Sequence, residues 1–488
     1  MVKFITDLKK TPPFQGGDEL SSDMSSSFRG NRGLRSAEDA IKEKKYLVLI
    51  VIVIFCTFFR FGEDRVIFTD ELLIEDASFG FSKGEWLIVP KINGKIDLAK
   101  PPLVYWITSL PYFLAEPQPW TRNLLQPLFG VGLVAVIFLF AKRFYDDKSA
   151  FWSVAFLVTS FPYIFFTKTA NFDLANAFFV TAAIYVYNLS KTRKKYLGLL
   201  TVLLTITVLT RSFLAIFAYG TIVLDFLFQK KRALSLKKIF VVILTSLILS
   251  LPWHILAYKN APNNFIEQYI KIPTSYHAQG TLLGETQNPL SYYLLIFILF
   301  PAGGFSLIYL FQTVRKVRKN TIDIQLIFWF LIIFILLTVS KTRHLWYAVP
   351  IIVPLSLLAG RFVSLNLKKE EFNFKHILIS AFAIVCLVIY PLLIIFRPLP
   401  EADIIRATRT FLKATASYRE LYIWKYPFLP VTRFFPNRSV LLISSKDQLP
   451  WNDWSYVLTR REDLENFDEY FSEKLYIGED FALIKIKR

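Results

Sequence analysis

The sequence predicts a polytopic α-helical membrane protein with about 11 transmembrane helices and a small α/β domain at its C-terminal end. Three observations support this prediction. Hydrophobic residues make up 54% of the 488 residues, well above the share in an ordinary soluble domain. The apolar residues gather into runs near the length that crosses a bilayer, and charged or turn-rich breaks separate the runs. After residue 397 this pattern ends.

Residues 1–45 are polar and rich in Gly, Ser and charge. They lack the short apolar core and small-residue cleavage site of a secretory signal. We expect a mostly disordered cytoplasmic tail, in which Arg35, Lys42, Lys44 and Lys45 form a basic flank before the first helix.

The predicted membrane domain covers residues 46–397. Its 48 Phe, 23 Tyr and 10 Trp residues suit helices that face acyl chains and carry aromatic rings at the interfaces. The predicted spans are 46–60, 124–141, 150–167, 172–189, 196–210, 212–229, 239–257, 290–312, 324–340, 344–361 and 376–396.

Positive charge predicts the orientation of these spans. Basic clusters at 142–148, 191–195, 230–238, 315–319 and 368–375 occupy every second loop, and cytoplasmic loops are the ones enriched in Lys and Arg. All five clusters lie inside only if the apolar stretch 101–116, which Pro111 interrupts, does not cross the membrane. A full span there is the alternative, and it would place all five outside. The favoured topology puts the loops 61–123 and 258–289 and the segment 398–488 outside.

The net charge of +19 is compatible with nucleic-acid binding, but the basic residues lie in short clusters between apolar segments. We therefore interpret them as topology determinants and contacts to anionic lipid, and expect the bilayer and no nucleic acid as a partner. The two cysteines, Cys56 and Cys386, both lie within apolar stretches, so neither a disulfide framework nor a cysteine metal site is expected.

The segment 398–488 alternates between strand and helix patterns. RELYIW, SVLLIS and FALIKIK are strand-like, whereas REDLENFDEYF is helix-like. The predicted topology places this α/β domain outside the membrane.

The predicted topology also brings polar residues from several outer turns to one membrane face. They are Asp70, Glu71, Lys100, Asp173, Arg211, His254, Lys341, Arg343 and His344. A carboxylate can accept a proton from an attacking hydroxyl, and cations can hold a phosphate as it leaves. Each basic residue alone is more simply explained as a side chain that reaches toward lipid head groups. Their convergence is what indicates a site.

Ordered motifs give this chain a resemblance to a known family. Asp70-Glu71, Gly84-Glu85-Trp86, Lys100-Pro101-Pro102-Leu103 and Tyr105-Trp106 are similar to the first outer loop of the bacterial lipid A aminoarabinose transferases and of dolichyl-phosphate-mannose protein mannosyltransferases. Further matches are Pro90, Gly94, Arg122, the TANFD segment ending at Asp173, Pro252-Trp253-His254 with Phe265, and the run from Lys341 to Gly360. These families are glycosyltransferases of the GT-C fold.

The resemblance implies an inverting membrane glycosyltransferase that uses a sugar linked to a polyprenyl phosphate, such as undecaprenyl phosphate. By match, Asp70 resembles the catalytic carboxylate, Lys100 the lysine at the donor phosphate, and Asp173 a second essential acidic position. Glu71 is either a further catalytic residue or a cap on a surface helix. Arg211, Lys341, Arg343 and His344 are candidates for the donor phosphate, and Tyr105, Trp253, His254 and Tyr347 for other substrate contacts.

The acceptor stays open among lipid A, another glycan and protein. The expected location is the cytoplasmic (inner) membrane, with the site facing the periplasm or exterior.

Three positions depart from the pattern of lipid A-modifying relatives. Leu73 replaces a common Arg, Ala99 replaces the Glu before Lys-Pro, and Arg211-Ser212 replaces a Lys-Gly pair. The first two changes remove a phosphate contact and a metal ligand, so no cofactor is assigned and the dependence on a divalent metal stays open. Arg211 can supply the missing positive charge.

Two other functions compete with this one. A transporter or lipid flippase predicts charges near the bilayer midplane and paired broken helices, whereas here the charges lie at helix ends. A receptor that binds through its outer domain leaves the loop from Asp70 to Lys100 unexplained.

Overall fold

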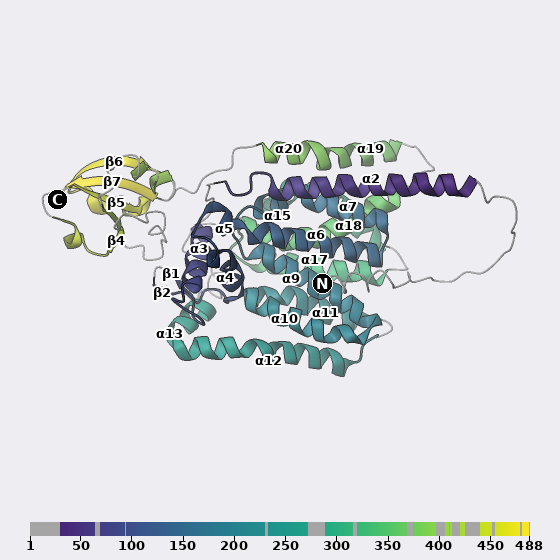
Figure 1. The fold of residues 1–488 in the computed structure, drawn as a ribbon, viewed down its shortest axis with the longest axis horizontal. Coiled ribbons are helices and arrows are strands. Elements are labelled where there is room, and N and C mark those ends of the chain that lie inside the picture. The colour runs from purple at the N-terminus through teal and green to yellow at the C-terminus, as the bar shows by residue number, and fades with distance from the viewer. Residues whose placement is uncertain are drawn as a thin grey trace.

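The structure is a computed structural model. It describes residues 30–63, 69–92, 94–229, 233–271, 288–315, 320–367, 374–396, 406–408, 410–411, 420–424, 440–450, 454–478 and 481–487. A bundle of long helices fills its centre, with short loop elements at one end and a sheet domain beyond that same end (Figure 1). This arrangement separates an apolar body from one polar end.

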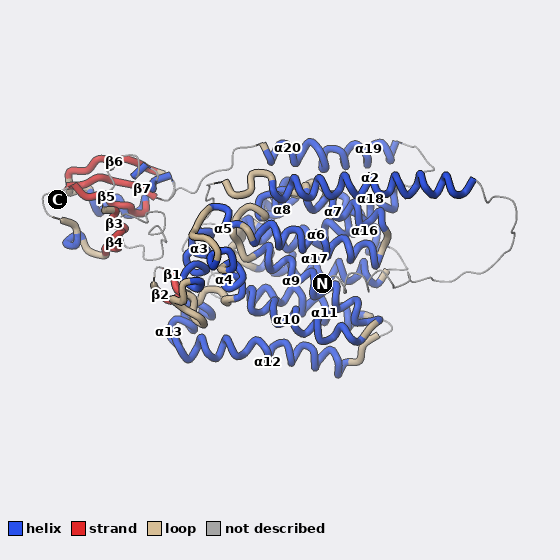
Figure 2. The backbone as a smooth tube through the Cα atoms, viewed as in Figure 1, coloured by secondary structure: helices blue, strands red, loops and turns tan. Residues whose placement is uncertain are grey.

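The long helices run roughly side by side, as Figure 2 shows. They are α2 (Gly30–Phe58), α6 (Leu125–Phe144), α7 (Asp147–Val158), α9 (Asp173–Thr192), α10 (Leu197–Arg211), α11 (Ile216–Phe228), α12 (Leu236–Asn260), α15 (Pro289–Leu299), α16 (Gly303–Arg315), α17 (Thr321–Val339), α18 (Ala348–Asn366), α19 (Phe374–Ile384) and α20 (Tyr390–Ile395). Short connections η2 (Lys194–Tyr196), η3 (Ser212–Ala215), η5 (Leu345–Tyr347) and the π-helix η6 (Val385–Ile389) join some of them.

The predicted tail ended at residue 45, but α2 already begins at Gly30. The helix therefore extends through the charged residues that precede its apolar part, and the domain boundary at 45 stays a prediction. Residues 1–29 lie outside the described residues.

Within the described residues, six helical stretches are long and apolar enough to cross a membrane, and a seventh arises if the bent pair α15 and α16 forms one span. That pair turns by 111°. The protein is thus a multi-pass membrane protein, while the number 11 stays a prediction.

One of the six stretches, Lys194–Phe228, folds back on itself at Arg211. Arg211 pairs with Asp173 at the start of α9, whereas Asp225 of α11 accepts a hydrogen bond from Tyr187 near the end of α9. The two arms, α10 and α11, therefore run in opposite directions along α9. This hairpin agrees with the two separate spans predicted at 196–210 and 212–229.

The loop elements at the polar end are short. They are α3 (Thr69–Ser82), β1 (Lys91–Ile92), β2 (Lys95–Ile96), α4 (Leu103–Thr108), η1 (Leu110–Phe113), α5 (Pro119–Asn123), α8 (Phe161–Phe166), α13 (Pro262–Asn264) and the π-helix η4 (Phe265–Lys271). The stretch 101–116 becomes α4 and η1, and at 1.5 Å per residue six residues cover only about 9 Å. Neither helix is long enough to cross a bilayer, in agreement with the prediction.

Helix packing in the bundle includes one very close approach. A Cβ atom at Gly360 of α18 would lie 2.2 Å from Ser153 Oγ and 2.5 Å from the Ser153 backbone nitrogen on α7. Small residues allow membrane helices to approach in this way, and dispersion contacts then stabilise the pair. The two helices are also joined by the next residue of α18, where Arg361 pairs with Asp146, the N-cap of α7, at 2.7 Å.

The C-terminal domain is a five-stranded sheet in the order β4-β3-β5-β7-β6. Its strands are β3 (Leu421–Trp424), β4 (Val440–Ile443), β5 (Trp454–Arg460), β6 (Phe471–Ile477) and β7 (Phe481–Lys487), with the 3-10 helices η8 (Lys446–Gln448) and η9 (Arg461–Phe467). β3 is parallel to β4 and β5, and β7 is antiparallel to β5 and β6. The register pairs Leu421 with Val440 and Tyr456, and Val457 with Ile484.

Sequence patterns predicted β3, β4 and β7 and the helical turn at η9. They missed β5, and they extended the helix into Phe471, where β6 begins. The error has a physical reason. Strand β6 alternates only weakly, and its pairing with β7 contains an irregularity between Lys474 and Tyr476.

The sheet domain also contacts the polar end of the bundle. Leu72 of α3 is buried in the same apolar cluster as Phe411, Leu421, Ile423 and Leu458. The helix that carries Asp70 therefore has one of its own side chains in the core of the C-terminal domain.

Candidate active site

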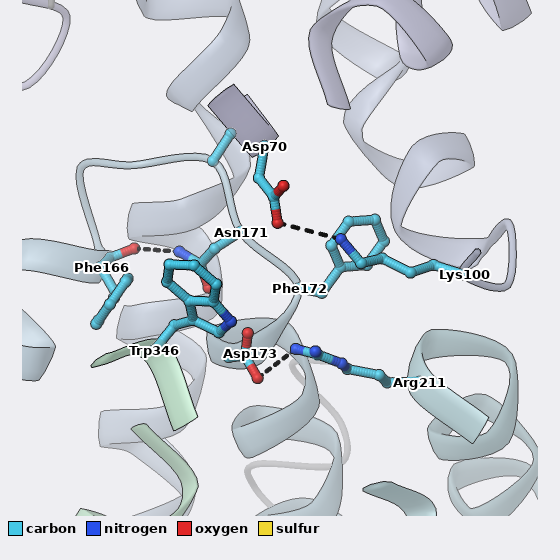
Figure 3. Close-up of a pocket in the computed structure, with 9 residues that line it drawn as sticks. Asp70, Lys100, Phe166, Asn171, Phe172, Asp173, Arg211 and Trp346 are labelled. Carbon is cyan, nitrogen blue, oxygen red and sulfur yellow. Dashed lines mark hydrogen bonds and ion pairs between the residues drawn. The ribbon is translucent and has the colours of Figure 1, made fainter. Parts of the chain in front are cut away.

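A cleft opens at the polar end of the bundle, where α3, α9 and α10 meet the connection before α4. It holds about 300 Å³ of space between protein atoms, its open mouth included. Figure 3 shows its lining, which consists of Asp70, Lys100, Phe166, Ala170, Asn171, Phe172, Asp173, Arg211 and Trp346. Four of the residues singled out from the sequence are among them.

Asp70 and Lys100 form the first ion pair of the cleft. Asp70 lies in the first turn of α3, and Lys100 Nζ is 3.2 Å from its Oδ2. The Lys100 ammonium also lies 4.6 Å from the centre of the Phe172 ring, a cation–π distance. The Asp70 side chain remains 43% exposed, so a substrate can reach it.

Asp173 and Arg211 form the second ion pair. Asp173 is in the first turn of α9, where the helix dipole favours a negative charge, and Arg211 ends α10. The Arg211 Nη1 atom contacts Asp173 Oδ1, and its guanidinium lies 5.4 Å from the centre of the Tyr347 ring. In Figure 3 the two pairs face each other across the cleft.

The remaining wall is aromatic and amide in character. Trp346 lines the cleft, and the His344 ring stacks on it at 4.3 Å between centroids and 13° between planes. Asn171 is fixed by its hydrogen bonds, because its Nδ2 donates to the Phe166 carbonyl at 2.9 Å and its Oδ1 accepts from Leu174 N at 2.8 Å. Sequence reasoning did not single out Phe166, Asn171 or Trp346, although all three lie within or next to the matched motifs.

The charges around Asp70 keep it ionised. Burial raises the pKa of the Asp70 carboxyl, but the neighbouring Lys100, with Arg211 and His344, lowers it further, and the net pKa lies below its ordinary value. A carboxylate is thus available at neutral pH.

Asp97 is a second carboxylate near Lys100, and sequence reasoning did not identify it. Its Oδ2 accepts a hydrogen bond from Tyr105 Oη at 3.2 Å, and its Oδ1 accepts one from Ala99 N at 3.2 Å. Burial raises the pKa of Asp97 more than Lys100 and these hydrogen bonds lower it, so the net pKa lies above its ordinary value. The sequence offered only a single Asp in a short polar loop as a signal.

Glu71 lies outside the cleft lining and is completely buried. Its charge acts on Arg122, whose Nη1 pairs with Glu75 Oε2 at 3.1 Å. Asp70 lines the cleft and Glu71 does not, because adjacent residues of an α-helix point in directions about 100° apart. The geometry favours a structural role for Glu71.

Two of the expected phosphate contacts also lie elsewhere. Arg343 is buried and donates from Nε to the Leu337 carbonyl and from Nη2 to the Thr338 carbonyl, at 2.8 and 2.7 Å. It thereby satisfies backbone groups at the C-terminal end of α17. Lys341 is exposed and is not part of the cleft lining.

The other expected substrate contacts hold the outer loop in place. Trp253 Nε1 donates to the Ile88 carbonyl at 2.9 Å, and Tyr105 packs edge-on against Phe172 at 5.2 Å between centroids. His254 Nε2 lies 2.7 Å from Tyr269 Oη. Of this group, Tyr347 comes nearest the cleft through its contact with Arg211.

The residues of the cleft do not fit a divalent metal. Among the described residues, no group of three His, Cys, Asp or Glu side chains is close enough to hold a metal ion. The two carboxylates of the cleft are each paired with a cation, and Ala99 offers no oxygen from its side chain. A metal site would need donors that this arrangement lacks.

Comparisons with known proteins point to one class. The family model described as dolichyl-phosphate-mannose-protein mannosyltransferase matches residues 99–256. An undecaprenyl phosphate-α-4-amino-4-deoxy-L-arabinose arabinosyl transferase of Shewanella sediminis is 25% identical over 295 residues, which are 57% of this chain and 52% of the relative. The chain thus spans about half the length of this curated relative.

Solved structures share the fold. ArnT from Cupriavidus metallidurans, bound to undecaprenyl phosphate, is 14% identical with a TM-score of 0.67, and the match covers 91% of this chain and 98% of that one. The oligosaccharyltransferase AglB from Archaeoglobus fulgidus, in complex with an inhibitory peptide and a dolichol-phosphate, is 8% identical with a TM-score of 0.55, over 87% and 70% of the two chains.

The bundle with its polar end therefore shares its fold with the ArnT and AglB structures. Over part of its length the chain is similar in sequence to an aminoarabinose transferase and to the protein mannosyltransferase family model.

Proposed function

We propose that this protein transfers a sugar from a polyprenyl-phosphate donor to an acceptor hydroxyl or phosphate at the outer face of the cytoplasmic membrane. The observation that carries the proposal is the pair of carboxylate–cation contacts, Asp70–Lys100 and Asp173–Arg211, facing each other in one cleft. The undecaprenyl phosphate in the ArnT structure and the dolichol-phosphate in the AglB complex support this donor class.

The proposed reaction is an inverting displacement at the anomeric carbon. The acceptor oxygen attacks that carbon, and Asp70 takes the acceptor's proton when the acceptor is a hydroxyl. The bond between the anomeric carbon and the phosphate oxygen breaks, and its electron pair stays on the leaving lipid phosphate. Lys100 and Arg211 neutralise the charge that develops there.

The ion pairs suggest how donor binding prepares the base. Without a donor, Lys100 holds Asp70 at a low pKa, and a carboxylate with a low pKa is a weak base. A lipid phosphate attracts Lys100 and Arg211 away from the two carboxylates. The pKa of Asp70 then rises, and the carboxylate becomes a better proton acceptor just when the sugar is in place.

The transporter alternative has less support. The charged side chains of the cleft lie at helix ends at one end of the bundle, whereas a transport pathway requires them near its middle. The candidate acceptors are a lipid, a glycan and a protein.

Replacement of the base tests the proposal. Asp70→Asn keeps the side-chain shape but removes its basicity, so we expect it to insert and bind a lipid-linked donor while transfer slows by about 10²–10⁴-fold. Lys100→Ala should mainly weaken donor binding. Sugar transfer per folded molecule, donor binding by a labelled polyprenyl phosphate, and detergent-extracted yield separate these effects.

Glu116→Gln is a matched control, because Glu116 is an exposed carboxylate of the same outer loop and pairs with Lys83 at 2.9 Å. It should transfer sugar at the wild-type rate. Wild-type turnover by Asp70→Asn would remove Asp70 from the chemistry.

A further inference from the structure

A second cavity lies behind the wall of the active-site cleft. It is bounded by the end of α2, by α8 and by α20. Its walls are formed by Phe59, Ile164, Phe165, Ile394 and Ile395. These side chains are apolar throughout, so a chain lying against them would contact hydrocarbon.

Lys168 lines the same cavity and gives it a positive charge. Its Nζ donates to the Cys56 carbonyl at 2.6 Å and to the Ile164 carbonyl at 2.7 Å, which accounts for two of its three N–H groups. No carboxylate pairs with it in the part of the chain that the structure describes. Burial, together with Arg60, lowers its pKa to about 7. An anion placed here would therefore favour the charged form of this lysine.

Arg60 contributes a second cation at the same place. Its backbone is in the left-handed region, with φ of 62°, which is uncommon for a residue with a side chain. Its guanidinium contacts Glu63 and donates to the Ile395 carbonyl at 3.3 Å. The turn after α2 thus holds Arg60 over the cavity, and the group Arg60, Glu63 and Lys168 carries a net charge of +1 when Lys168 is protonated.

The surroundings indicate where an occupant would come from. Leu393 and Phe396 of the α20 region are each 68% exposed, as expected for side chains that face acyl chains. α20 lies at the edge of the bundle in Figure 1. The cavity therefore lies at the lipid-facing edge, near the end of the helices where head groups are found.

We propose that this cavity binds an anionic glycerophospholipid of the surrounding leaflet, with its phosphate on Lys168 and Arg60 and one acyl chain between α8 and α20. The site is separate from the donor site. One segment, residues 164–173, forms a wall of both, since Ile164, Phe165 and Lys168 face the lipid cavity and Phe166 and Ala170–Asp173 face the cleft. The bound lipid would stabilise the wall that carries Asp173.

The test uses the full-length protein, purified in detergent and delipidated, with binding of phosphatidylglycerol and phosphatidylcholine measured by native mass spectrometry. We expect wild type to prefer phosphatidylglycerol. Lys168→Ala should weaken that binding about tenfold, a factor that corresponds to the loss of one lipid-facing charge contact. Ile394→Trp should weaken it to a similar extent, because the indole fills the chain cavity while the cations remain.

Lys83→Ala is the control, since Lys83 is an outer-loop lysine that already pairs with Glu116. It should bind phosphatidylglycerol like wild type. If Lys168→Ala does not fold, phosphatidylglycerol binding by Ile394→Trp alone tests the proposal. Equal binding by wild type and both cavity variants would overturn the proposal, and so would equal affinity for phosphatidylcholine. Loss of undecaprenyl phosphate binding together with phosphatidylglycerol binding would also overturn it, because the cavity would then belong to the donor site.

Discussion

At the scale of residues, burial disfavours the ionised form of Asp97 although Lys100 lies near it. Its hydrogen bonds from Tyr105 and Ala99 do not offset the cost of burial, since its pKa is raised. A raised folded-state pKa means that the native state prefers the protonated carboxyl. Ionisation of Asp97 therefore lowers the free energy of unfolding as the pH rises above the ordinary Asp pKa, and the effect becomes constant above the folded-state pKa.

Asp97→Asn tests the direction of this dependence of stability on pH. The variant carries no charge at any pH, so its stability relative to wild type should increase as the pH rises through about 4, the unfolded-state value, and then level off. Thermal unfolding of both proteins in detergent across this range provides the measurement. A relative stability of the variant that falls with rising pH would contradict the assigned direction of the pKa shift.

The charges of the cleft also predict how the enzyme responds to chelators. Lys100 and Arg211 supply two positive charges, and among the described residues no group of three His, Cys, Asp or Glu side chains is placed to hold a metal ion. Sugar transfer by purified protein should therefore persist in excess chelator. Complete loss of transfer that returns when a divalent cation is added would show that metal neutralises the phosphate instead.

Motif order predicted Asp70, Lys100 and Asp173, and the predicted topology added Arg211 at a departure from the family pattern. These four residues do line one cleft. Their roles in the reaction stay predictions. Arg343 could not be separated from its neighbours by sequence, because its burial depends on how the chain turns back onto the end of α17. Asp97 was missed for a similar reason, since only the folded loop places it beside Tyr105 and Lys100.

At the scale of elements, the contact between α7 and α18 depends on the absence of a side chain at Gly360. Gly360→Ala would place a methyl group within 2.5 Å of the Ser153 backbone, which cannot move without shifting α7. Overpacking of this kind costs about 1–3 kcal/mol. We expect a lower midpoint of thermal unfolding in detergent.

Gly198→Ala makes the same substitution in α10 where no atom lies within 4 Å of the added Cβ. Because Ala is favoured over Gly in helix interiors by about 0.5–1 kcal/mol, this variant should be as stable as wild type or more so. Equal destabilisation by both substitutions would mean that packing against Ser153 is not the cause.

The spacing of apolar residues predicted most helices, but it did not place all of their ends. The break at Arg211 was placed correctly because a charge interrupts two apolar runs. The start of α2 was not, since charged residues outside the bilayer continue a helix without any change in its hydrogen bonding.

At the scale of the whole molecule, the alternation of basic clusters predicts that the C-terminal domain is outside and the loop at 191–195 is inside. Single cysteines at Thr192 and Ser445 test this, because both positions are exposed whereas the native Cys56 and Cys386 are buried. An impermeant thiol reagent should label Ser445→Cys in intact cells and Thr192→Cys only after permeabilisation. If only Thr192→Cys is labelled in intact cells, the membrane topology is opposite to the predicted one.

The burial of Leu72 among Phe411, Leu421 and Ile423 limits how this protein can be rearranged. Asp70 is half a helical turn away from Leu72 on α3, so the sheet domain helps to orient the proposed base. Exchanging the C-terminal domain between relatives would thus expose an apolar side chain and loosen the adjacent carboxylate, unless α3 were exchanged as well. The sheet domain is therefore not an independently exchangeable module. We expect α3 and the C-terminal domain, although far apart in the chain, to change together during evolution.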